Sequence, residues 1–482
     1  MGLMNSRRSF LKSVGVGAAL GALNGYSPAE VRTQGRTNTA SKIKSPNIIY
    51  IIVDDMGPLD PGCYGGNKQK LPTPNIDKMA REGMRFTEAY SGCCVCAPAR
   101  SVLMTGRHMG HTTVRGNLGG ISLLASDVTV AEVLKQGGYK VGGFGKWGIA
   151  EVGTPGVPEK HGFDEFFGYY HQVHAHNYWT NYLWRNSKKV ELKGKIGSPG
   201  RYTHHVIFER AKKFIRTNKD RPFFCYCPWT PPHGRWHIPN DDPTMAELKD
   251  KPWPGKAKVY AAMIAMVDRH LGEVIDLLKE LKIDDNTVVF FCSDNGGYPA
   301  FGNFFGSNGP YRGQKTNLYE GGIRIPLIVR WPGKIAPGSR SDLPWYFADV
   351  MPTLADLTGT TKYLPKDIDG LSTAPTLTGR PGEQKTHEFL YWEYTRVADW
   401  KKFTYVTNGL QQAVRMGKWK LVRMKDNIPF ELYDLSKDVG EKDDLAGKHP
   451  EIVKKMSAIA RREHTEPTSQ AEPKNPEGKR FR

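Results

Sequence analysis

Runs of apolar residues alternate with amphipathic stretches along most of the chain. The longest apolar runs are Asn47–Val53 and 287–292, and shorter ones cover 140–143 and 222–226. Runs that are apolar throughout and rich in β-branched residues are typical of strands buried on both faces of a sheet. Helical periodicity covers the stretches 129–136, 204–216 and 258–281. The alternation predicts an α/β domain with a large, mostly parallel central sheet flanked by helices.

The pattern changes after about residue 380. Segments 388–394, 405–412, 413–423 and 430–434 have the composition of short antiparallel strands, and Pro450–Glu463 has helical periodicity. We predict a main catalytic domain at 46–380 and a smaller C-terminal α+β domain with an antiparallel sheet at 381–464. Residues 465–482, which contain Pro, Glu, Lys and Ser, are expected to form a polar tail.

The N-terminus carries a targeting pattern. In Ser6-Arg7-Arg8-Ser9-Phe10-Leu11-Lys12 two arginines precede Phe-Leu-Lys, and a short uncharged run follows at 14–23. A permanent membrane helix needs roughly 20 apolar residues, so this run is too short to be one. We interpret 1–29 as a twin-arginine signal read by the Tat translocon and 30–45 as a linker. The mature protein is expected to be periplasmic or secreted, with no permanent membrane anchor.

Composition adds a basic excess. The 482 residues include 68 Lys and Arg against 49 Asp and Glu, a net charge of +19. With 39% hydrophobic and 24% charged residues, the composition excludes a disordered chain, a collagen-like fibre and a membrane bundle. The charge favours a polyanionic partner, which leaves open nucleic acid, an anionic membrane surface and an acidic glycan.

The seven cysteines include a crowded group, Cys93-Cys94-Val95-Cys96. This group cannot form a disulfide framework and lacks a second cluster at zinc-finger spacing. Cys96 is followed by Ala97-Pro98-Ala99-Arg100 and then by Leu103-Met104-Thr105-Gly106-Arg107. Pro98 suits the first turn of a helix, so a nucleophile at Cys96 would lie at the positive end of the helix dipole. Arg100, one turn later, would place a cation beside it.

The motif C-x-P-x-R, followed by a hydrophobic pair and T-G-R, resembles the signature of the type I, arylsulfatase-like sulfatases. The resemblance extends from about Asn47 to Asp434. It implies an alkaline-phosphatase-like fold and conversion of Cys96 to formylglycine by a formylglycine-generating enzyme, with Arg100 holding the aldehyde hydrate. The implied reaction is hydrolysis of a sulfate ester through a covalent sulfo-enzyme intermediate. With the basic charge, the expected substrate is a sulfated polysaccharide or its oligosaccharides.

Two pairs of oxygen-bearing residues each end a predicted buried strand: Asp54-Asp55 and Asp294-Asn295. Such a set suits Ca²⁺ or Mg²⁺ better than Zn²⁺. In similar sulfatases these positions bind Ca²⁺, and an oxygen of the hydrated residue at Cys96 completes the coordination. Related phosphatases that use zinc or manganese usually have His after the second Asp, where this chain has Asn295.

Three further residues match family motifs. Lys146 in Gly145-Lys146-Trp147 and Lys315 in the segment 315–322 correspond to the sulfate-binding lysines. His233 in Thr230-Pro231-Pro232-His233 corresponds to the histidine that protonates the leaving alcohol, a step that needs a general acid.

One position departs from the family pattern. The family often has His two residues after the first lysine, where it helps to expel sulfate, and this chain has Gly148. The replacement base is expected in the run His171-Gln172-Val173-His174-Ala175-His176-Asn177-Tyr178. We favour His176, with His174 second.

Aromatic and charged residues in predicted loops are candidate sugar contacts, because aromatic faces stack on sugar rings. The candidates are Trp179, Trp184, Trp229, Trp236, Trp392, Glu393 and Arg396. Two other functions stay open: a phosphate or phosphonate ester hydrolase on the same fold, and an inactive exported protein that binds polyanions. A nucleic-acid partner is not expected, because the chain has no basic helix or binding motif and is predicted to be exported.

Overall fold

The structure is a computed structural model that describes residues 45–65, 70–117, 121–196, 201–298, 303–399 and 404–467. The predicted export signal (1–29), the linker up to residue 44 and the tail from residue 468 lie outside these residues.

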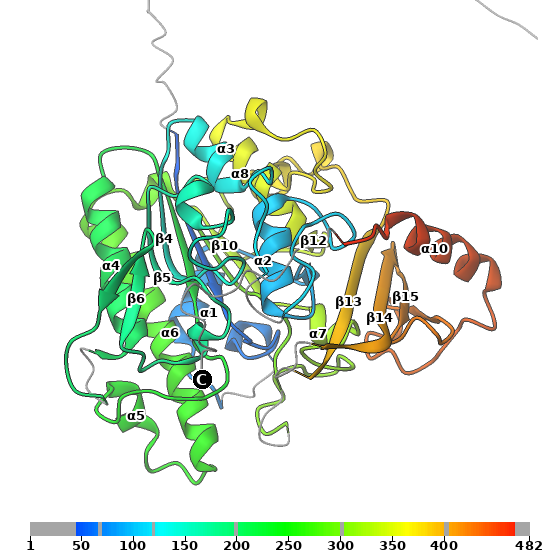
Figure 1. The fold of residues 1–482 in the computed structure, drawn as a ribbon, viewed down its shortest axis with the longest axis horizontal. Coiled ribbons are helices and arrows are strands. Elements are labelled where there is room, and N and C mark those ends of the chain that lie inside the picture. The colour runs from blue at the N-terminus through cyan, green and yellow to red at the C-terminus, as the bar shows by residue number, and fades with distance from the viewer. Residues whose placement is uncertain are drawn as a thin grey trace, which may run out of the picture. The chain divides into compact units, whose positions relative to one another are not determined.

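A ten-stranded mixed sheet forms the centre of the described chain (Figure 1). In sheet order its strands are β11 (Ser339–Ser341), β2 (Met84–Phe86), β10 (Leu327–Arg330), β9 (Thr287–Ser293), β1 (Asn47–Val53), β8 (Phe223–Trp229), β4 (Lys140–Lys146), β5 (Glu165–Tyr169), β6 (Tyr182–Arg185) and β7 (Lys188–Glu191). The five central strands, from β9 to β5, pair in parallel, and antiparallel pairs flank them on both sides. The prediction of a large, mostly parallel sheet is confirmed.

Helices cover both faces of this sheet. The helices are α1 (Pro74–Glu82), α2 (Cys96–Thr105), α3 (Val130–Gln136), α4 (Thr203–Asn218), α5 (Pro243–Leu248), α6 (Gly255–Glu280), α7 (Glu320–Ile323), α8 (Val350–Thr358), α9 (Ala374–Leu377) and α10 (Pro450–Glu463). Short 3₁₀ helices lie at Gly62–Tyr64, Pro158–Lys160, His174–His176, Asp284–Asn286, Phe347–Asp349, Thr361–Tyr363 and Pro381–Glu383. Among the described residues, no helix has the length and apolar character needed to cross a membrane.

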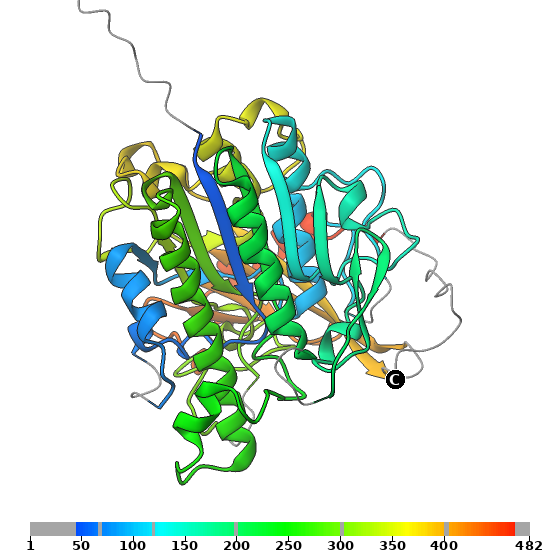
Figure 2. The same ribbon diagram turned by 90° about the vertical axis from the view of Figure 1, so that its left-hand side faces the viewer.

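The side chains of β1 show why helices must cover both faces of the sheet. Successive residues of a strand point to opposite faces. Ile48, Tyr50 and Ile52 pack into a core that includes residues of α2, α3 and α8. The residues between them, such as Ile49 and Ile51, pack with α1, α4 and α6 on the other face. Figure 2 shows the helices that cover this face. A strand that is buried on both sides is therefore apolar at every position.

The C-terminal sheet is antiparallel, in the order β13 (Leu390–Asp399), β14 (Thr404–Met416), β15 (Trp419–Arg423) and β16 (Glu431–Asp434). Helix α10 packs on one face through Met456, Ile459 and Ala460. The other face packs against the main core, where Trp392 Nε1 donates to the Ser91 carbonyl at 2.8 Å. The predicted small antiparallel sheet with a C-terminal helix is confirmed, and a two-stranded parallel pair, β3 (Ala89–Tyr90) with β12 (Trp345–Tyr346), lies apart from both sheets.

One strand prediction needs correction. The segment 413–423, expected to be one strand, contains the turn between β14 and β15. Gly417 has a φ of +57°, a left-handed conformation that glycine adopts without steric cost. Apolar and basic residues alternate on both sides of this turn in paired antiparallel strands, so the alternation continues through a reversal of the chain.

Candidate active site

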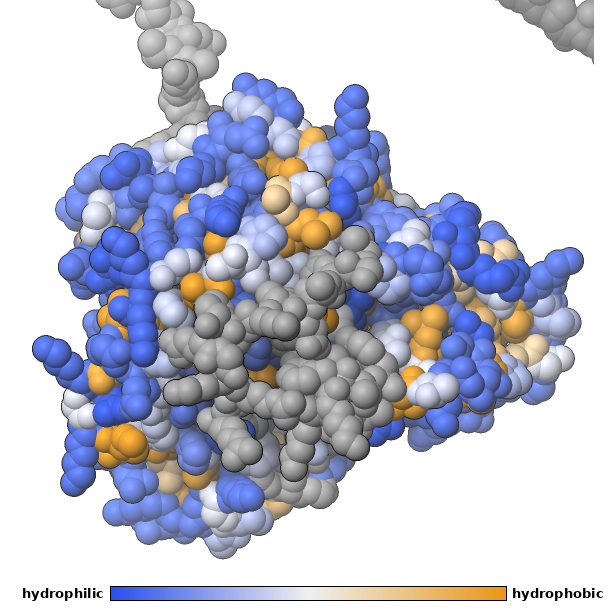
Figure 3. Space-filling view, viewed as in Figure 1, coloured by the Kyte–Doolittle hydropathy of each residue, from blue (hydrophilic) through white to orange (hydrophobic). Residues whose placement is uncertain are grey.

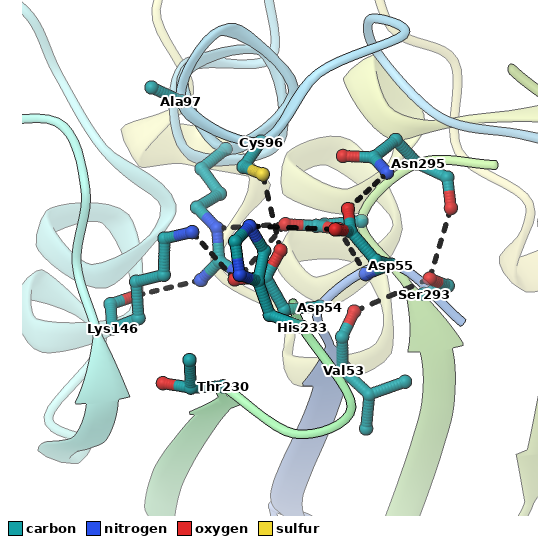
Figure 4. A network of polar contacts seen from close by, with 12 residues as sticks. Val53, Asp54, Asp55, Cys96, Ala97, Lys146, Thr230, His233, Ser293 and Asn295 are labelled. Atoms are coloured by element: carbon teal, nitrogen blue, oxygen red, sulfur yellow. Dashed lines mark hydrogen bonds and ion pairs between the residues drawn. The ribbon is translucent and has the colours of Figure 1, made fainter. Parts of the chain in front are cut away.

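The parallel pairing of β1 with β9 brings the two acidic pairs together. Val53 lies opposite Ser293, so Asp54-Asp55 and Asp294-Asn295 leave the sheet at the same edge. The Asp294 N–H donates to the Val53 carbonyl at 2.9 Å, and the Asp55 N–H donates to Asp294 Oδ1 at 3.2 Å. Asp54, Asp294 and Asn295 are fully buried and Asp55 is nearly so. These residues therefore form one cluster, and Figure 4 shows Asp54, Asp55 and Asn295 in it.

Cys96 is the first residue of α2 and points at this cluster, as Figure 4 shows. Its Sγ lies 3.1 Å from Asp54 Oδ1, and its side chain is fully buried. The start of the helix is held by Asn117, whose Oδ1 accepts the Ala97 N–H at 3.0 Å. Burial, together with Asp54, raises the pKa of the Cys96 thiol. The thiol is therefore uncharged at neutral pH and, as it stands, a poor nucleophile.

Two buried cations, Arg100 and Lys146, form ion pairs with the carboxylates of this cluster. Arg100 donates to Asp294 Oδ2 through Nη2 at 2.8 Å and to the Lys146 carbonyl through Nη1 at 2.7 Å. Lys146, the last residue of β4, places its Nζ 2.6 Å from Asp54 Oδ2. Burial alone would raise the pKa of Asp54, but the neighbouring cations, Lys146 foremost, hold it well below its usual value. Asp54 is therefore ionised although it is buried.

Lys315 and His233 both lie next to Asp55. Lys315 Nζ is 2.7 Å from Asp55 Oδ2 and donates to His233 Nε2 at 3.2 Å. Burial, followed by the positive charge of Lys315, lowers the pKa of His233 to about 4, so its imidazole is neutral in this state. The loop that carries Lys315 is held by Gln411 of β14, whose Nε2 donates to the Thr316 carbonyl at 3.0 Å. The C-terminal sheet thus helps to place this lysine.

His176 also reaches the cluster, and His174 does not. The His176 imidazole stacks on that of His233, with ring centroids 3.9 Å apart. Its Nε2 is buried without a hydrogen-bond partner among the described residues. Burial, with His233 next, holds the pKa of His176 well below its usual value. His174 instead bonds Thr180 Oγ1 at 2.8 Å and packs edge-on against Tyr169.

The candidate sugar contacts are scattered. Trp179 and Trp236 are half-buried, and Trp179 packs against Tyr202. Glu393 is buried and pairs with Arg115 at 3.1 Å, whereas Arg396 is exposed on β13. Trp184 is half-buried against the main core.

Trp229 and Trp392 need a correction. Both are fully buried, Trp229 on β8 and Trp392 on β13. Neither ring can stack on a sugar from solution, because packed protein covers both. Their apolar surface serves the core, which the sequence pattern alone did not distinguish from a loop position.

The site has donors that fit a hard cation. Asn295 Nδ2 donates to Asp55 Oδ1 at 2.8 Å, while Asn295 Oδ1 is buried without a partner among the described residues. The ligand atoms of Asp54, Asp55, Cys96 and His233 lie within 4.8 Å of one another. An orphaned amide oxygen beside converging carboxylates is the donor chemistry that Ca²⁺ prefers. The residues therefore fit the predicted ion.

Sequence reasoning missed one residue of this site. Gln172, on the loop after β5, is 2% exposed, and its Oε1 is buried without a partner in the described chain. It lies within the histidine-containing run 171–178, but a neutral amide is not part of any motif that we recognised. Its position next to Gly148, which follows β4, is known only from the folded structure.

Comparison with known proteins places the chain in a family. A sulfatase family model matches residues 46–360, and one described as N-sulphoglucosamine sulphohydrolase, C-terminal, matches 311–465. The chain is 32% identical to an arylsulfatase of Hemicentrotus pulcherrimus, over 80% of this chain and 69% of that protein. It is 29% identical to an N-acetylgalactosamine-6-O-sulfatase of Bacteroides thetaiotaomicron, over 86% and 92% of the two chains.

Solved structures agree with the sequence comparisons. The crystal structure of Ps i-CgsB in complex with k-i-k-neocarrahexaose superposes with a TM-score of 0.74 and 27% identity, covering 88% of this chain and 94% of that one. The fold and the site thus define a sulfuric ester hydrolase with alkaline-phosphatase-like architecture. The chain belongs to the type I sulfatase family.

Proposed function

We propose that this protein is a calcium-dependent sulfatase of sulfated polysaccharides or their oligosaccharides, with formylglycine made from Cys96 as its nucleophile. The observation that carries the proposal is the state of Cys96 in its surroundings. Its thiol is buried, uncharged and 3.1 Å from Asp54 Oδ1, at the start of α2. A thiol there cannot become a thiolate easily, whereas an aldehyde hydrate needs no ionisation of sulfur.

The charge of the centre supports an anionic substrate. The carboxylates of Asp54, Asp55 and Asp294 are matched by three cations, Arg100, Lys146 and Lys315. These groups balance one another without any ion. A divalent cation held by the carboxylates would leave the site with excess positive charge, which favours a bound sulfate group.

The proposed roles follow from position. Asp54, Asp55, Asp294 and Asn295 would hold Ca²⁺, which supplies Lewis-acid stabilisation of charge on the sulfate oxygens. Arg100 orients the hydrate at residue 96, from which one hydroxyl attacks sulfur. Lys146 and Lys315 donate to sulfate oxygens when they are released from Asp54 and Asp55.

Protons move at two imidazoles in this proposal. Lys315 and His233, 3.2 Å apart, would supply the proton that the leaving alcohol needs. A bound anionic ester raises the pKa of His233, because a nearby negative charge favours the imidazolium. His176 takes a proton from the second hydroxyl of the hydrate as sulfate leaves. This assigns to His176 the base role left open by Gly148.

The substrate class rests on similarity and charge. A relative is named as an N-acetylgalactosamine-6-O-sulfatase, and a neighbouring structure contains neocarrahexaose. The net charge of +19 favours polyanionic substrates. We also propose export through the Tat translocon to the periplasm or medium, and maturation by a formylglycine-generating enzyme. The boundary between the catalytic and C-terminal domains is proposed at residue 380.

Phosphate or phosphonate ester hydrolysis is the competing activity. A phosphonate monoester hydrolase of Agrobacterium radiobacter has a similar fold, with a TM-score of 0.62 and 20% identity. The test compares sulfate, phosphate and phosphonate esters of one aryl alcohol with the purified calcium-loaded enzyme. We expect the highest kcat/KM for the sulfate ester. A higher value for either phosphorus ester would contradict the proposal, and activity retained in Cys96→Ala would contradict its nucleophile.

A further inference from the structure

Thr316, the residue after Lys315, has a backbone conformation that its own side chain disfavours. Its φ is +79°, in the left-handed region, where a β-branched residue is a rare outlier. A strained residue of this kind persists only when the surrounding structure fixes it. Because Thr316 is bonded directly to a lysine of the candidate active site, the contacts that fix its backbone also affect that lysine.

The backbone of Thr316 is held on both sides. Its N–H donates to the carbonyl of Cys94, two residues before Cys96, at 2.8 Å. Its carbonyl accepts a hydrogen bond from Gln411 Nε2, on β14, at 3.0 Å. Thr316 therefore lies between the segment that carries Cys96 and the C-terminal sheet, and each of them supplies one hydrogen bond.

The carboxamide of Gln411 bonds this turn at two points. Besides donating to the Thr316 carbonyl, it accepts the Leu318 N–H through Oε1 at 3.2 Å. Gln411 is 1% exposed and Leu318 is fully buried. The carboxamide thus pairs with the C=O of one residue and the N–H of the second residue after it. Only a group that carries a donor and an acceptor together can make both bonds.

The position of Lys315 depends on this turn. Its Nζ lies 2.7 Å from Asp55 Oδ2 and 3.2 Å from His233 Nε2. The φ of Thr316 describes rotation about its N–Cα bond, so it sets the direction of the peptide that joins Lys315 to the rest of the turn. Rotation of Thr316 out of the left-handed region would therefore redirect Lys315 relative to both partners.

We propose that Gln411 is a positioning residue, whose carboxamide holds Thr316 in the left-handed conformation and thereby keeps Lys315 Nζ where it binds the sulfate group. This inference rests on the proposed function, which assigns sulfate binding to Lys315. Gln411 acts through the turn and not by contact with the substrate. Because it belongs to β14, the C-terminal sheet takes part in setting the rate of ester hydrolysis.

The next residue of the same strand provides a matched control. Gln412 is 3% exposed, and its Nε2 donates to the Tyr391 hydroxyl at 2.8 Å and to the Ala460 carbonyl at 3.2 Å. Successive residues of a strand point to opposite faces, so Gln412 points away from the Lys315 loop. Gln412→Met therefore removes a buried carboxamide of the same kind without touching that loop.

The experiment measures kcat/KM with the calcium-loaded enzyme and an aryl sulfate whose leaving phenol is acidic, so that weak variants stay measurable. Gln411→Met keeps the side-chain length and loses both hydrogen bonds, and kcat/KM should fall roughly tenfold. Gln412→Met should keep the wild-type value. Equal kcat/KM in Gln411→Met and wild type, or an equal loss in the two methionine variants, would overturn the proposal.

Two double variants separate positioning from a general loss of structure. In a Lys315→Ala background, Gln411→Met should cause little further loss of kcat/KM, because the group that it positions is already absent. Losses that multiply would show that Gln411 acts independently of Lys315 and would overturn the proposal. Thr316→Gly adopts the left-handed conformation without steric strain, so it should recover part of the loss in Gln411→Met. No recovery would refute the role of the Thr316 conformation.

Two measurements come first and keep this inference separate from the proposed function. Absence of formylglycine or of sulfate ester turnover in wild type, or full activity in Lys315→Ala, would overturn the proposed function and this inference with it. If both measurements pass, the Gln411 variants test the positioning role alone. Thermal melting shows whether each variant folds. Should Gln411→Met not fold, Gln411→Glu keeps the shape and loses the donor to Thr316, and wild-type kcat/KM in that variant would overturn the proposal.

Discussion

Asn295 Oδ1, Gln172 Oε1 and His176 Nε2 are three buried side-chain atoms in or beside the candidate active site without hydrogen-bond partners among the described residues. They differ in chemistry. The amide oxygen of Asn295 lies among carboxylates and suits a cation. The oxygen of Gln172 is the atom nearest to a Cβ built on Gly148, and the imidazole of His176 is neutral.

The role of Asn295 can be tested by removing its oxygen. Asn295→Leu keeps the side-chain shape and loses both the amide oxygen and the bond to Asp55. We expect calcium affinity, measured by isothermal titration calorimetry, to fall at least about tenfold, because one oxygen ligand is lost. Asn286→Leu, whose amide bonds the Ser45 carbonyl, should leave it unchanged. Equal calcium affinity in Asn295→Leu and wild type would exclude Asn295 as a ligand.

At this scale, sequence motifs predicted much of the cluster. Cys96 and Arg100 lie at the start of α2, Lys146 ends β4, His233 follows β8, and Lys315 lies on the loop between β9 and α7. The position of Gln172 could not be predicted, since it depends on the room left by Gly148. Glu393 and Trp392 look like exposed binding residues in sequence, but tertiary packing buries both.

The bounds of strands and helices were predictable where the burial pattern stays the same along the whole element. β1 and α10 have the predicted bounds, since every residue of β1 is buried and α10 presents one apolar face. The turn at Gly417 was missed because apolar and basic residues alternate on both sides of it, as in one strand. A chain reversal inside such an alternation depends on strand pairing, which periodicity does not report.

The packing of α4 against α6 predicts a pH dependence of stability. His204 Nε2 lies 3.0 Å from His270 Nδ1, and both side chains are buried. Burial lowers the pKa of both well below the usual 6.5. Below that pH the unfolded chain binds protons that the folded protein does not. The free energy of unfolding should therefore fall by about 1.4 kcal/mol per histidine for each pH unit below about 6.5.

Urea denaturation between pH 7.5 and 5.5 measures this contribution. Asp60 and Asp268, whose pKa burial raises to about 6, act in the opposite direction, so the histidines are isolated by comparison with a variant. The double variant His204→Gln/His270→Gln should lose less stability than wild type over this range. The control variant His237→Gln, at an exposed histidine, should follow wild type. Parallel pH curves for the double variant and wild type would refute the assignment.

For the molecule as a whole, the residues of the active site do not account for the net positive charge. The site balances its own carboxylates and cations, so most of the excess of +19 lies elsewhere. The described residues on the face in Figure 3 are mostly hydrophilic, with apolar residues scattered among them. Long-range attraction between such a surface and a sulfated polymer is screened by salt.

Substrate length should therefore control the salt dependence. We expect KM for a sulfated polysaccharide to rise several-fold between about 0.01 and 0.3 M NaCl, because the Debye length falls below about 10 Å. KM for a small aryl sulfate, which contacts only the site, should change far less. Steady-state kinetics on both substrates check this. An equal salt effect on the two would show that the surface charge plays no part in substrate capture.

The overall architecture was more predictable than its contacts. Apolar runs and periodicity predicted the two kinds of sheet and helices α3, α4, α6 and α10. They could not predict that β14 would hold the Lys315 loop through Gln411, because both partners are polar and far apart in sequence. Nor could they show that Lys420 of β15 would lie 2.9 Å from both Glu320 and Glu441 in a fully buried ion network. Such contacts arise only when the C-terminal sheet packs on the main core.

The central claim is that residue 96 acts as formylglycine and not as cysteine. Peptide mass spectrometry across residues 91–107 of catalytically active protein tests it most directly. Co-expression with a formylglycine-generating enzyme ensures that maturation is available. The account predicts a peptide with the aldehyde at residue 96, at an occupancy that rises in proportion to sulfatase activity among preparations. Full sulfatase activity in protein whose Cys96 is unmodified would contradict it.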